Sequence, residues 1–164
     1  MNSYDKARQR EERALFGNTD ITTYTVSHIA RCLDRFVKEL YSSEVSFSYD
    51  KNMLGSITVN ANGLAHLIKT MFTLHGGTRY LYVKMFTAAM TVHLQFSRAE
   101  GFENPDELDI IEDACREAKL HMRLFGDTLD FYADLKCMHV IPVYEVTNEA
   151  FYRKLVFYFN HSKN

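Results

Sequence analysis

The stretch from Asn60 to Gly77, NANGLAHLIKTMFTLHGG, decides the fold. Its apolar residues recur at steps of three and four, which is the spacing of one face of an α-helix. The paired glycines Gly76 and Gly77 predict where this helix ends. The apolar stripe consists of Leu64, Leu67, Ile68, Met71, Phe72 and Leu74. Such a stripe must be buried, so the neighbouring segments have to supply a sheet or further helices.

A second amphipathic helix is predicted over residues 21–41, with Thr19 or Asp20 as its N-cap. Two short strands follow it, EVSFSYD at 44–50 and GSITVN at 55–60. The first strand alternates apolar and polar residues, which is typical of a half-buried strand. The apolar face of the helix consists of Val26, Ile29, Ala30, Leu33, Phe36, Val37 and Leu40.

After the central helix, the pattern predicts strands at about 79–87 and 90–97. An Asn-Pro-Asp start and an acidic first turn favour a helix over about 105–125. Gly126 and Asp127 then turn the chain, and residues 128–146 supply two more strands. The predicted buried stripe of the helix consists of Leu108, Ile111, Cys115, Ala118, Met122 and Phe125.

Strand pairs separated by helices predict an α+β fold: a two-layer α/β sandwich with one mixed sheet and helices on a single face. Three regions are expected. Residues 1–19 form a charged N-terminal arm, residues 20–147 the sandwich, and residues 148–164 an aromatic C-terminal extension. The extension is either a helix, with Phe151, Leu155 and Phe159 on one side, or a strand.

Composition narrows the class of protein. The chain has 164 residues, 46% hydrophobic and 24% charged, which suits one globular domain. The net charge of -2 comes from interspersed acids and bases, so we expect no nucleic-acid partner. Cys32, Cys115 and Cys137 lie far apart, which favours reduced thiols and a cytoplasmic protein. Neither a signal peptide nor a membrane-spanning run is apparent, so we expect no membrane partner.

Two segments, VSFSYDKNMLGSITVNANGLAHLIKTMF at 45–72 and KLHMRLFGDTLDFYADLKCMHVIPVYE at 119–145, resemble the ATP-binding domain of histidine kinases and their GHKL relatives. The resemblance covers about residues 20–147. It implies a histidine-kinase ATPase-like fold and a bacterial type of signal transduction. It also implies that the first segment leads into the helix carrying the asparagines of the nucleotide site. The second segment would be the closing helix, glycine turn and hairpin of the family.

The resemblance also shows where the nucleotide chemistry is missing. The family's two asparagines, which hold Mg²⁺ and phosphates, fall at Thr70 and Leu74. The family's aspartate, which accepts a hydrogen bond from the adenine amine, falls at Arg98, a donor without an acceptor. The glycines expected after it fall at Glu100 and Phe102. A later glycine motif falls near Glu112 and Ala114, whereas Gly101 lies between two mismatched positions and Gly126 matches.

We therefore interpret Thr70, Leu74, Arg98, Glu100, Gly101 and Gly126 as positions of a vestigial nucleotide pocket. Charge-assisted hydrogen bonds are worth about 1.5–3 kcal/mol each, so losing two or three costs roughly 3–9 kcal/mol. Micromolar binding amounts to about -8 kcal/mol. We expect no catalytic residues, no metal site and no cofactor. The expected function is that of an inactive domain that binds or regulates a protein partner, with a homodimer through residues 21–41 or the aromatic tail as one option.

Two alternatives stay open. In the first, the domain binds ATP and Mg²⁺ through unusual residues, with Thr70 holding the metal and Arg98 or Lys69 holding phosphate. In the second, it is a phosphotransfer adaptor that docks a response regulator and carries the phosphoryl group on His28. The simpler interpretation of His28 is a surface histidine on the first helix.

Two further clusters have simpler interpretations than a ligand site. Cys137 and His139 share one face of a predicted strand, but a closed metal site needs about four ligands. The acidic run consists of Asp106, Glu107, Asp109, Glu112 and Asp113. It could bind a cation or a basic partner, and it equally fits a solvated helix start stabilised by the helix dipole.

Overall fold

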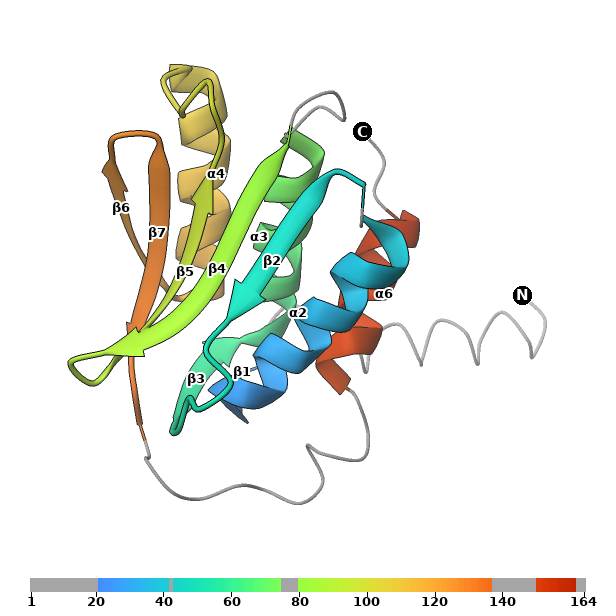
Figure 1. Ribbon diagram of the computed structural model, residues 1–164, viewed down its shortest axis with the longest axis vertical. Helices are drawn as coiled ribbons and strands as arrows, with labels where there is room; N and C mark the ends of the chain where they lie inside the picture. Colours follow the sequence, from blue (N-terminus) through green and yellow to red (C-terminus); the bar gives the residue numbers. More distant parts are fainter. Residues whose placement is uncertain (1–20, 42, 75–79, 137–149, 162–164) are drawn as a thin grey trace, which may run out of the picture.

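A mixed sheet of five strands forms one layer of the molecule in the computed structural model, which describes residues 21–41, 43–74, 80–136 and 150–161 (Figure 1). The strands, in their order across the sheet, are β2 (Val45–Tyr49), β4 (Leu81–Ala88), β5 (Thr91–Ser97), β7 (Thr128–Asp134) and β6 (His121–Phe125). β2 and β4 are parallel, and the other neighbours are antiparallel. The predicted alternation is confirmed, because Leu81, Val83 and Met85 are buried on one face of β4.

In the described part of the chain, four helices form the second layer: α2 (Val26–Leu40), α3 (Ala61–Leu74), α4 (Pro105–Ala118) and α6 (Ala150–His161). α3 contacts α4 on one side and α6 on the other, and α6 also contacts α2. Figure 1 shows α3 and α4 behind the sheet, with α2 and α6 next to its β2 edge. The predicted α+β sandwich, with helices on one face of a mixed sheet, is therefore confirmed.

The C-terminal segment, whose structure the sequence left open, is a helix over residues 150–161. Phe151 and Leu155 are buried, so α6 adds to the core. Phe159 makes edge contacts with the rings of Phe36 and Tyr41, at centroid distances of 6.3 and 5.6 Å. The apolar faces of α2 and α6 are thus used within the molecule.

The prediction that a helix covers residues 21–41 is wrong at its start. Residues 21–25 form strand β1 (Ile21–Thr25), which pairs antiparallel with β3 (Ser56–Asn60) in a separate two-stranded sheet. The sequence Ile-Thr-Thr-Tyr-Thr consists of β-branched and aromatic residues, which favour strands. α2 begins at Val26, and its N-cap is Thr25, whose Oγ1 accepts a 3.2 Å hydrogen bond from the backbone nitrogen of His28. The cap is therefore neither Thr19 nor Asp20.

The helix predicted over 105–125 is too long, because α4 ends at Ala118. Lys119 is left-handed, with φ of 65°, and its backbone nitrogen bonds the carbonyl of Arg116 at 3.1 Å. Residues 121–125 are instead strand β6, so the closing helix implied by the resemblance is absent from the start of the second segment. Met122 is only half-buried and Phe125 is 45% exposed, which removes both from the predicted helical stripe.

The Gly126–Asp127 turn is confirmed, since it joins β6 to β7 with Gly126 at φ of 58°. Three predictions fall outside the described residues. These are the charged N-terminal arm, the glycines that end the central helix, and the strand after β7 that carries Cys137 and His139.

Candidate functional site

The N-terminal end of α3 is fixed by a close approach to the C-terminal end of α4. A Cβ atom on Gly63 would lie 2.6 Å from the backbone oxygen of Glu117, so only glycine fits there without a shift of the backbone. The Asn60 side chain also donates a 3.1 Å hydrogen bond to that oxygen. These contacts set the direction of α3, and therefore the positions of Thr70 and Leu74 at its other end.

Thr70 and Leu74 both lie half-buried on α3, one turn apart. The carbonyl of Leu74 accepts a 3.4 Å hydrogen bond from Nη1 of Arg98. The end of the central helix is thereby joined to the loop that follows β5, as the resemblance requires for a shared site. No contact of the Thr70 side chain with Arg98 is observed among the described residues.

Arg98 is the centre of this site, although its side chain is only 7% exposed. Its Nε donates a 2.7 Å hydrogen bond to the carbonyl of Gly101, and its Nη2 is paired with the carboxylate of Glu107 on α4. The guanidinium also lies over the ring of Phe102, 4.2 Å from the centroid. Arg98 therefore links the end of α3, the loop 98–104 and the first turn of α4.

The remaining predicted positions differ in how close they lie to Arg98. Glu100 lies close enough for an ion pair, with 3.7 Å between its Oε1 and Nε of Arg98. Gly101 is buried and adopts φ of 69°, which suits glycine. A Cβ on Gly101 would lie 3.9 Å from Cα of Asp127, so the loop approaches the turn that contains the exposed Gly126. The structure thus brings Leu74, Glu100 and Gly101 to Arg98, whereas no contact of Thr70 or Gly126 with this arginine is observed among the described residues.

The electrostatics of the site differ from those of an adenine and triphosphate pocket. The buried guanidinium has carbonyl and carboxylate partners, so its donors are occupied by the protein itself. Glu100 and Glu107 place carboxylates beside Arg98, at the position that the resemblance assigns to adenine recognition. Within the described ranges, no group of three His, Cys, Asp or Glu side chains could hold a metal ion.

The acidic run at the start of α4 is divided between two roles. Asn104 caps the helix by accepting hydrogen bonds from the backbone nitrogens of Asp106 and Glu107. Glu112 and Asp113 pair with the exposed Arg116 on the same helix. This is a solvated, dipole-stabilised helix start, with the exception of Glu107, whose carboxylate is 18% exposed and serves Arg98.

A cavity of about 20 Å³ lies between the helices and the sheet. It is lined by apolar side chains such as Ile29 of α2, Leu64 of α3 and Phe131 of β7. Ligand pockets are typically about 300–1,000 Å³, so this cavity is a packing gap in the core.

Lys69, proposed to hold phosphate under one alternative, faces α6. Its Nζ lies 4.6 Å from the centroid of the Phe159 ring and 3.3 Å from the hydroxyl of Tyr41. Burial lowers the pKa of Lys69, because the charged ammonium is partly removed from water.

His28 is not the surface histidine expected from its sequence, because it is 3% exposed. Its ring stacks on Tyr24 at 5.4 Å, and its Nε2 lies 3.6 Å from the sulfur of Cys32. The sequence suggested a surface position because His28 is polar. The ring that stacks on it, Tyr24, is only four residues away in β1, but Tyr24 also contacts Phe151 of α6, which is distant in sequence.

The chain is similar in architecture to solved structures of histidine-kinase domains. The catalytic domain of histidine kinase ThkA superposes with a TM-score of 0.50 at 9% sequence identity, over 71% of this chain and 97% of that domain. The fold is that of a histidine-kinase catalytic domain. The cytoplasmic segment of histidine kinase QseC has a TM-score of 0.44 at 12% identity, over 85% of this chain and 97% of that segment. Acinetobacter baumannii histidine kinase AdeS has a TM-score of 0.44 at 10% identity, over 84% of this chain and 77% of that structure.

At the level of sequence, no protein-family model and no curated protein matches the chain. No helix in the described part of this histidine-kinase-like domain is long and apolar enough to cross a membrane. The roles that the resemblance assigns to individual positions stay predictions.

Two residues of the site were missed by sequence analysis. Glu107 was interpreted as one member of a solvated acidic run, and Phe102 as a mismatched glycine position. A signal for Glu107 was present, because Asn104 and Pro105 mark the helix start and place Glu107 in the first turn, next to the loop of Arg98.

Proposed function

We propose that this chain is a catalytically inactive histidine-kinase-like domain that acts as a protein-interaction or regulatory module in two-component-type signalling. The observation that carries this proposal is Arg98. It stands where the resemblance requires an acceptor for the adenine amine, and it is buried and bonded to Leu74, Gly101 and Glu107. A nucleotide would have to displace this arginine from its ion pair before it could bind.

The alternative with an unusual ATP site draws less support from the geometry. It needs Arg98 or Lys69 to hold phosphate, yet the partners of Arg98 are internal and Lys69 lies against Tyr41 and Phe159. Glu100 and Glu107, which both lie beside Arg98, would compete with a phosphate group for this guanidinium. The adaptor alternative needs an accessible phosphoacceptor, and the burial of His28 weighs against that residue.

The test is a thermal-unfolding titration of the full chain with Mg-ATP, Mg-ADP and Mg²⁺ alone. A ligand at 100 times its dissociation constant stabilises by about 2.7 kcal/mol. For a chain of this size, that free energy corresponds to a rise in Tm of roughly 5–10 °C. We expect no rise at millimolar nucleotide.

A magnesium-dependent rise in Tm would contradict the proposal. The variant Thr70→Ala would then decide between sites, because the ATP-binding alternative requires this variant to lose the rise. An unchanged rise in Thr70→Ala would place the nucleotide elsewhere in the fold.

A further inference from the structure

The face of the sheet opposite the helices carries a row of four rings, one from each of four neighbouring strands. The strand register places Phe86 opposite His93, His93 opposite Tyr132, and Tyr132 opposite His121. These residues alternate with the buried ones along each strand, so they share the open face. On the same face Tyr82 is 57% exposed and Phe125 is 45% exposed, so the described residues leave it open to solvent.

The four rings stand upright rather than lie flat. Phe86 and His93 are 5.0 Å apart with an angle of 13° between their planes, and His93 and Tyr132 are 5.9 Å apart at 29°. His121 and Tyr132 are 5.2 Å apart at 31°. Nearly parallel rings this close cover one another's faces and present their edges outward. Ring edges carry the positive part of the aromatic quadrupole, which suits anionic groups.

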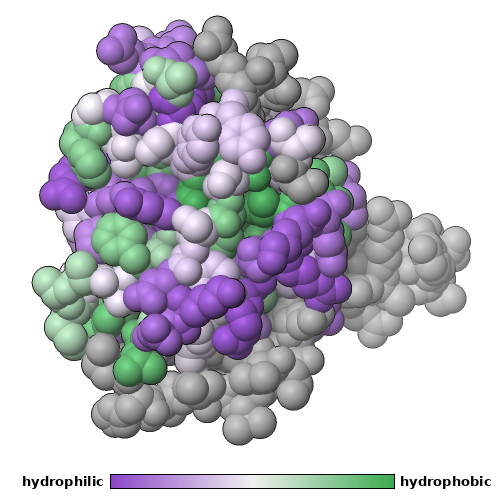
Figure 2. Space-filling view, viewed as in Figure 1, coloured by the Kyte–Doolittle hydropathy of each residue, from purple (hydrophilic) through white to green (hydrophobic). Residues whose placement is uncertain are grey.

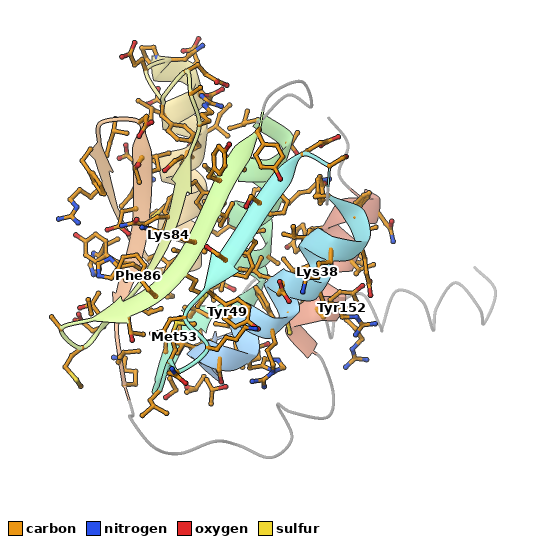
Figure 3. The ribbon with its side chains drawn as sticks, viewed as in Figure 1. Lys38, Tyr49, Met53, Lys84, Phe86 and Tyr152 are labelled. Carbon is orange, nitrogen blue, oxygen red and sulfur yellow. The ribbon has the colours of Figure 1, made fainter. Side chains whose placement is uncertain are left out.

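The next row along the strands contains the charged groups Lys84, Asp130 and Arg123, with Gln95 between the first two. Lys84 is exposed, and its ammonium lies 5.4 Å from the centroid of the Phe86 ring. Arg123 is 60% exposed. Figure 3 shows Lys84 and Phe86 together on β4, away from Lys38 and Tyr152 on the helices.

Asp130 is 0% exposed and offsets part of the charge of Arg123, whereas Lys84 has no carboxylate partner among the described residues. Asp130 lies 3.0 and 3.1 Å from Nδ1 of His93 and accepts a 3.2 Å hydrogen bond from Nη2 of Arg123. The Asp130 carboxylate therefore pairs with side chains of the sheet itself. The groups that reach solvent from these two rows are cations, histidine and tyrosine edges, and an amide.

We propose that these two rows on the open sheet face dock an acidic segment of a partner protein. Carboxylates would pair with Lys84 and Arg123 and would meet the ring edges of the adjacent row. The inference rests on the proposed function as a protein-interaction module, and it names the surface and the chemistry of the partner. Figure 2 shows hydrophobic patches separated by hydrophilic surface on this side of the molecule, which fits a mixed polar contact better than a large apolar interface.

Single-stranded nucleic acid fits this surface less well. Proteins that bind it present open ring faces on which bases stack. Here the rings pack against one another, and Lys84 and Arg123 lie over the rings of Phe86 and Tyr132. The net charge of -2 also gives no general attraction for polyanions, so binding would depend on the local cations.

The experiment measures fluorescence anisotropy of three labelled probes of equal length at low salt: a Glu- and Asp-rich peptide, a Lys-rich peptide and a single-stranded oligothymidylate. We expect the acidic peptide to bind best. Lys84→Glu should weaken its binding about tenfold, because it reverses a charge at the contact. The matched control is Lys38→Glu, which makes the same change at a 72% exposed lysine on α2 and should weaken binding less than about twofold.

Three results would overturn the docking surface: no binding of the acidic peptide, equal weakening by Lys38→Glu, or tighter binding of the oligothymidylate. Circular dichroism of both variants shows that they fold. The nucleotide titration is independent of these results. If nucleotide does not raise Tm and the acidic peptide does not bind, the docking surface is rejected and the inactive-domain proposal stays supported. If nucleotide raises Tm, the inactive-domain proposal is rejected.

Discussion

The folded protein loses stability when one member of a buried ion pair is removed and the other is left without its counter-charge. Replacing Arg98 by methionine keeps much of its volume but leaves the Glu107 carboxylate, 18% exposed, without its partner. Breaking a buried pair in this way costs about 3–5 kcal/mol of unfolding free energy. We therefore predict a loss of this size for Arg98→Met in urea unfolding. Arg116→Met, at a residue with 68% side-chain exposure, should change stability by less than about 0.5 kcal/mol.

The double variant Arg98→Met/Glu107→Met separates the ion pair from simple packing. An apolar pair often replaces a buried ion pair at little cost, so the double variant should be more stable than Arg98→Met alone. A double variant that loses at least as much as the single variant would contradict the buried-charge explanation.

Replacing glycine by asparagine should lower stability strongly at Gly63 and only slightly at Gly126. At Gly63 the new side chain would meet the backbone of α4, so we expect a loss of about 3 kcal/mol or more. At Gly126, φ is 58° and no atom lies within 4 Å of an added Cβ. Asparagine tolerates the left-handed region, so the loss there should stay below about 1 kcal/mol. Thermal or urea unfolding measures both, and equal losses would refute the close approach of α3 to α4.

At the same scale, the site was partly predictable. The type of residue at position 98 was enough to predict a donor in place of an acceptor. The partner Glu107 could not be predicted, because an acidic residue in the first turn of a helix can face solvent or pair with a buried cation. The burial of His28 was likewise missed, because Tyr24 packs on it from a strand where a helix was predicted, and Phe151, which contacts Tyr24, is distant in sequence.

At the scale of elements, the end of α4 provides a stabilising prediction. Lys119 is exposed and holds φ of 65°, a conformation that costs a residue with a Cβ about 1 kcal/mol. Lys119→Gly should raise the unfolding free energy by about 0.5–1 kcal/mol. The neighbouring control Ala118→Gly, at a buried helical position, should lower it by about 1 kcal/mol or more. A loss of stability in Lys119→Gly would mean that the helix does not end in this way.

The same element explains where prediction of the fold succeeded and failed. Periodicity identified α3, β4 and β5, because each has a regular pattern with one buried face. It missed β6 because the apolar residues of 121–125 continue the helical spacing of α4, and a lysine rather than a glycine makes the turn between them. It missed β1 because that strand exists through pairing with β3, more than thirty residues away.

At the scale of the whole molecule, buried weak acids predict a loss of stability in alkali. Burial raises the pKa of the Cys115 thiol to about 11, with Glu112 adding to the rise and Arg116 opposing it. Burial also raises the pKa of Tyr41 and of Tyr158, as do their acidic neighbours. Above an ordinary thiol pKa of about 8.5 the unfolded chain loses protons before the folded one does, so stability falls with rising pH.

Cys115 alone should contribute a loss of up to about 3 kcal/mol between pH 8.5 and 11. Urea unfolding across this range measures the loss, and the tyrosines add to it above about pH 10. Cys115→Ala should flatten the profile below pH 10. A parent protein whose stability does not change up to pH 11 would contradict the burial of all three groups.

The position of α6 between α2 and α3 has a consequence for synthesis. The ribosome makes α2 early, but about 110 residues separate Leu40 from Ala150, which takes roughly 5–20 seconds at ordinary elongation rates. During that interval the rings of Phe36 and Tyr41 lack the covering ring of Phe159. The nascent chain therefore depends on α6 to cover α2, and this delay is a period in which chaperones have apolar surface to bind.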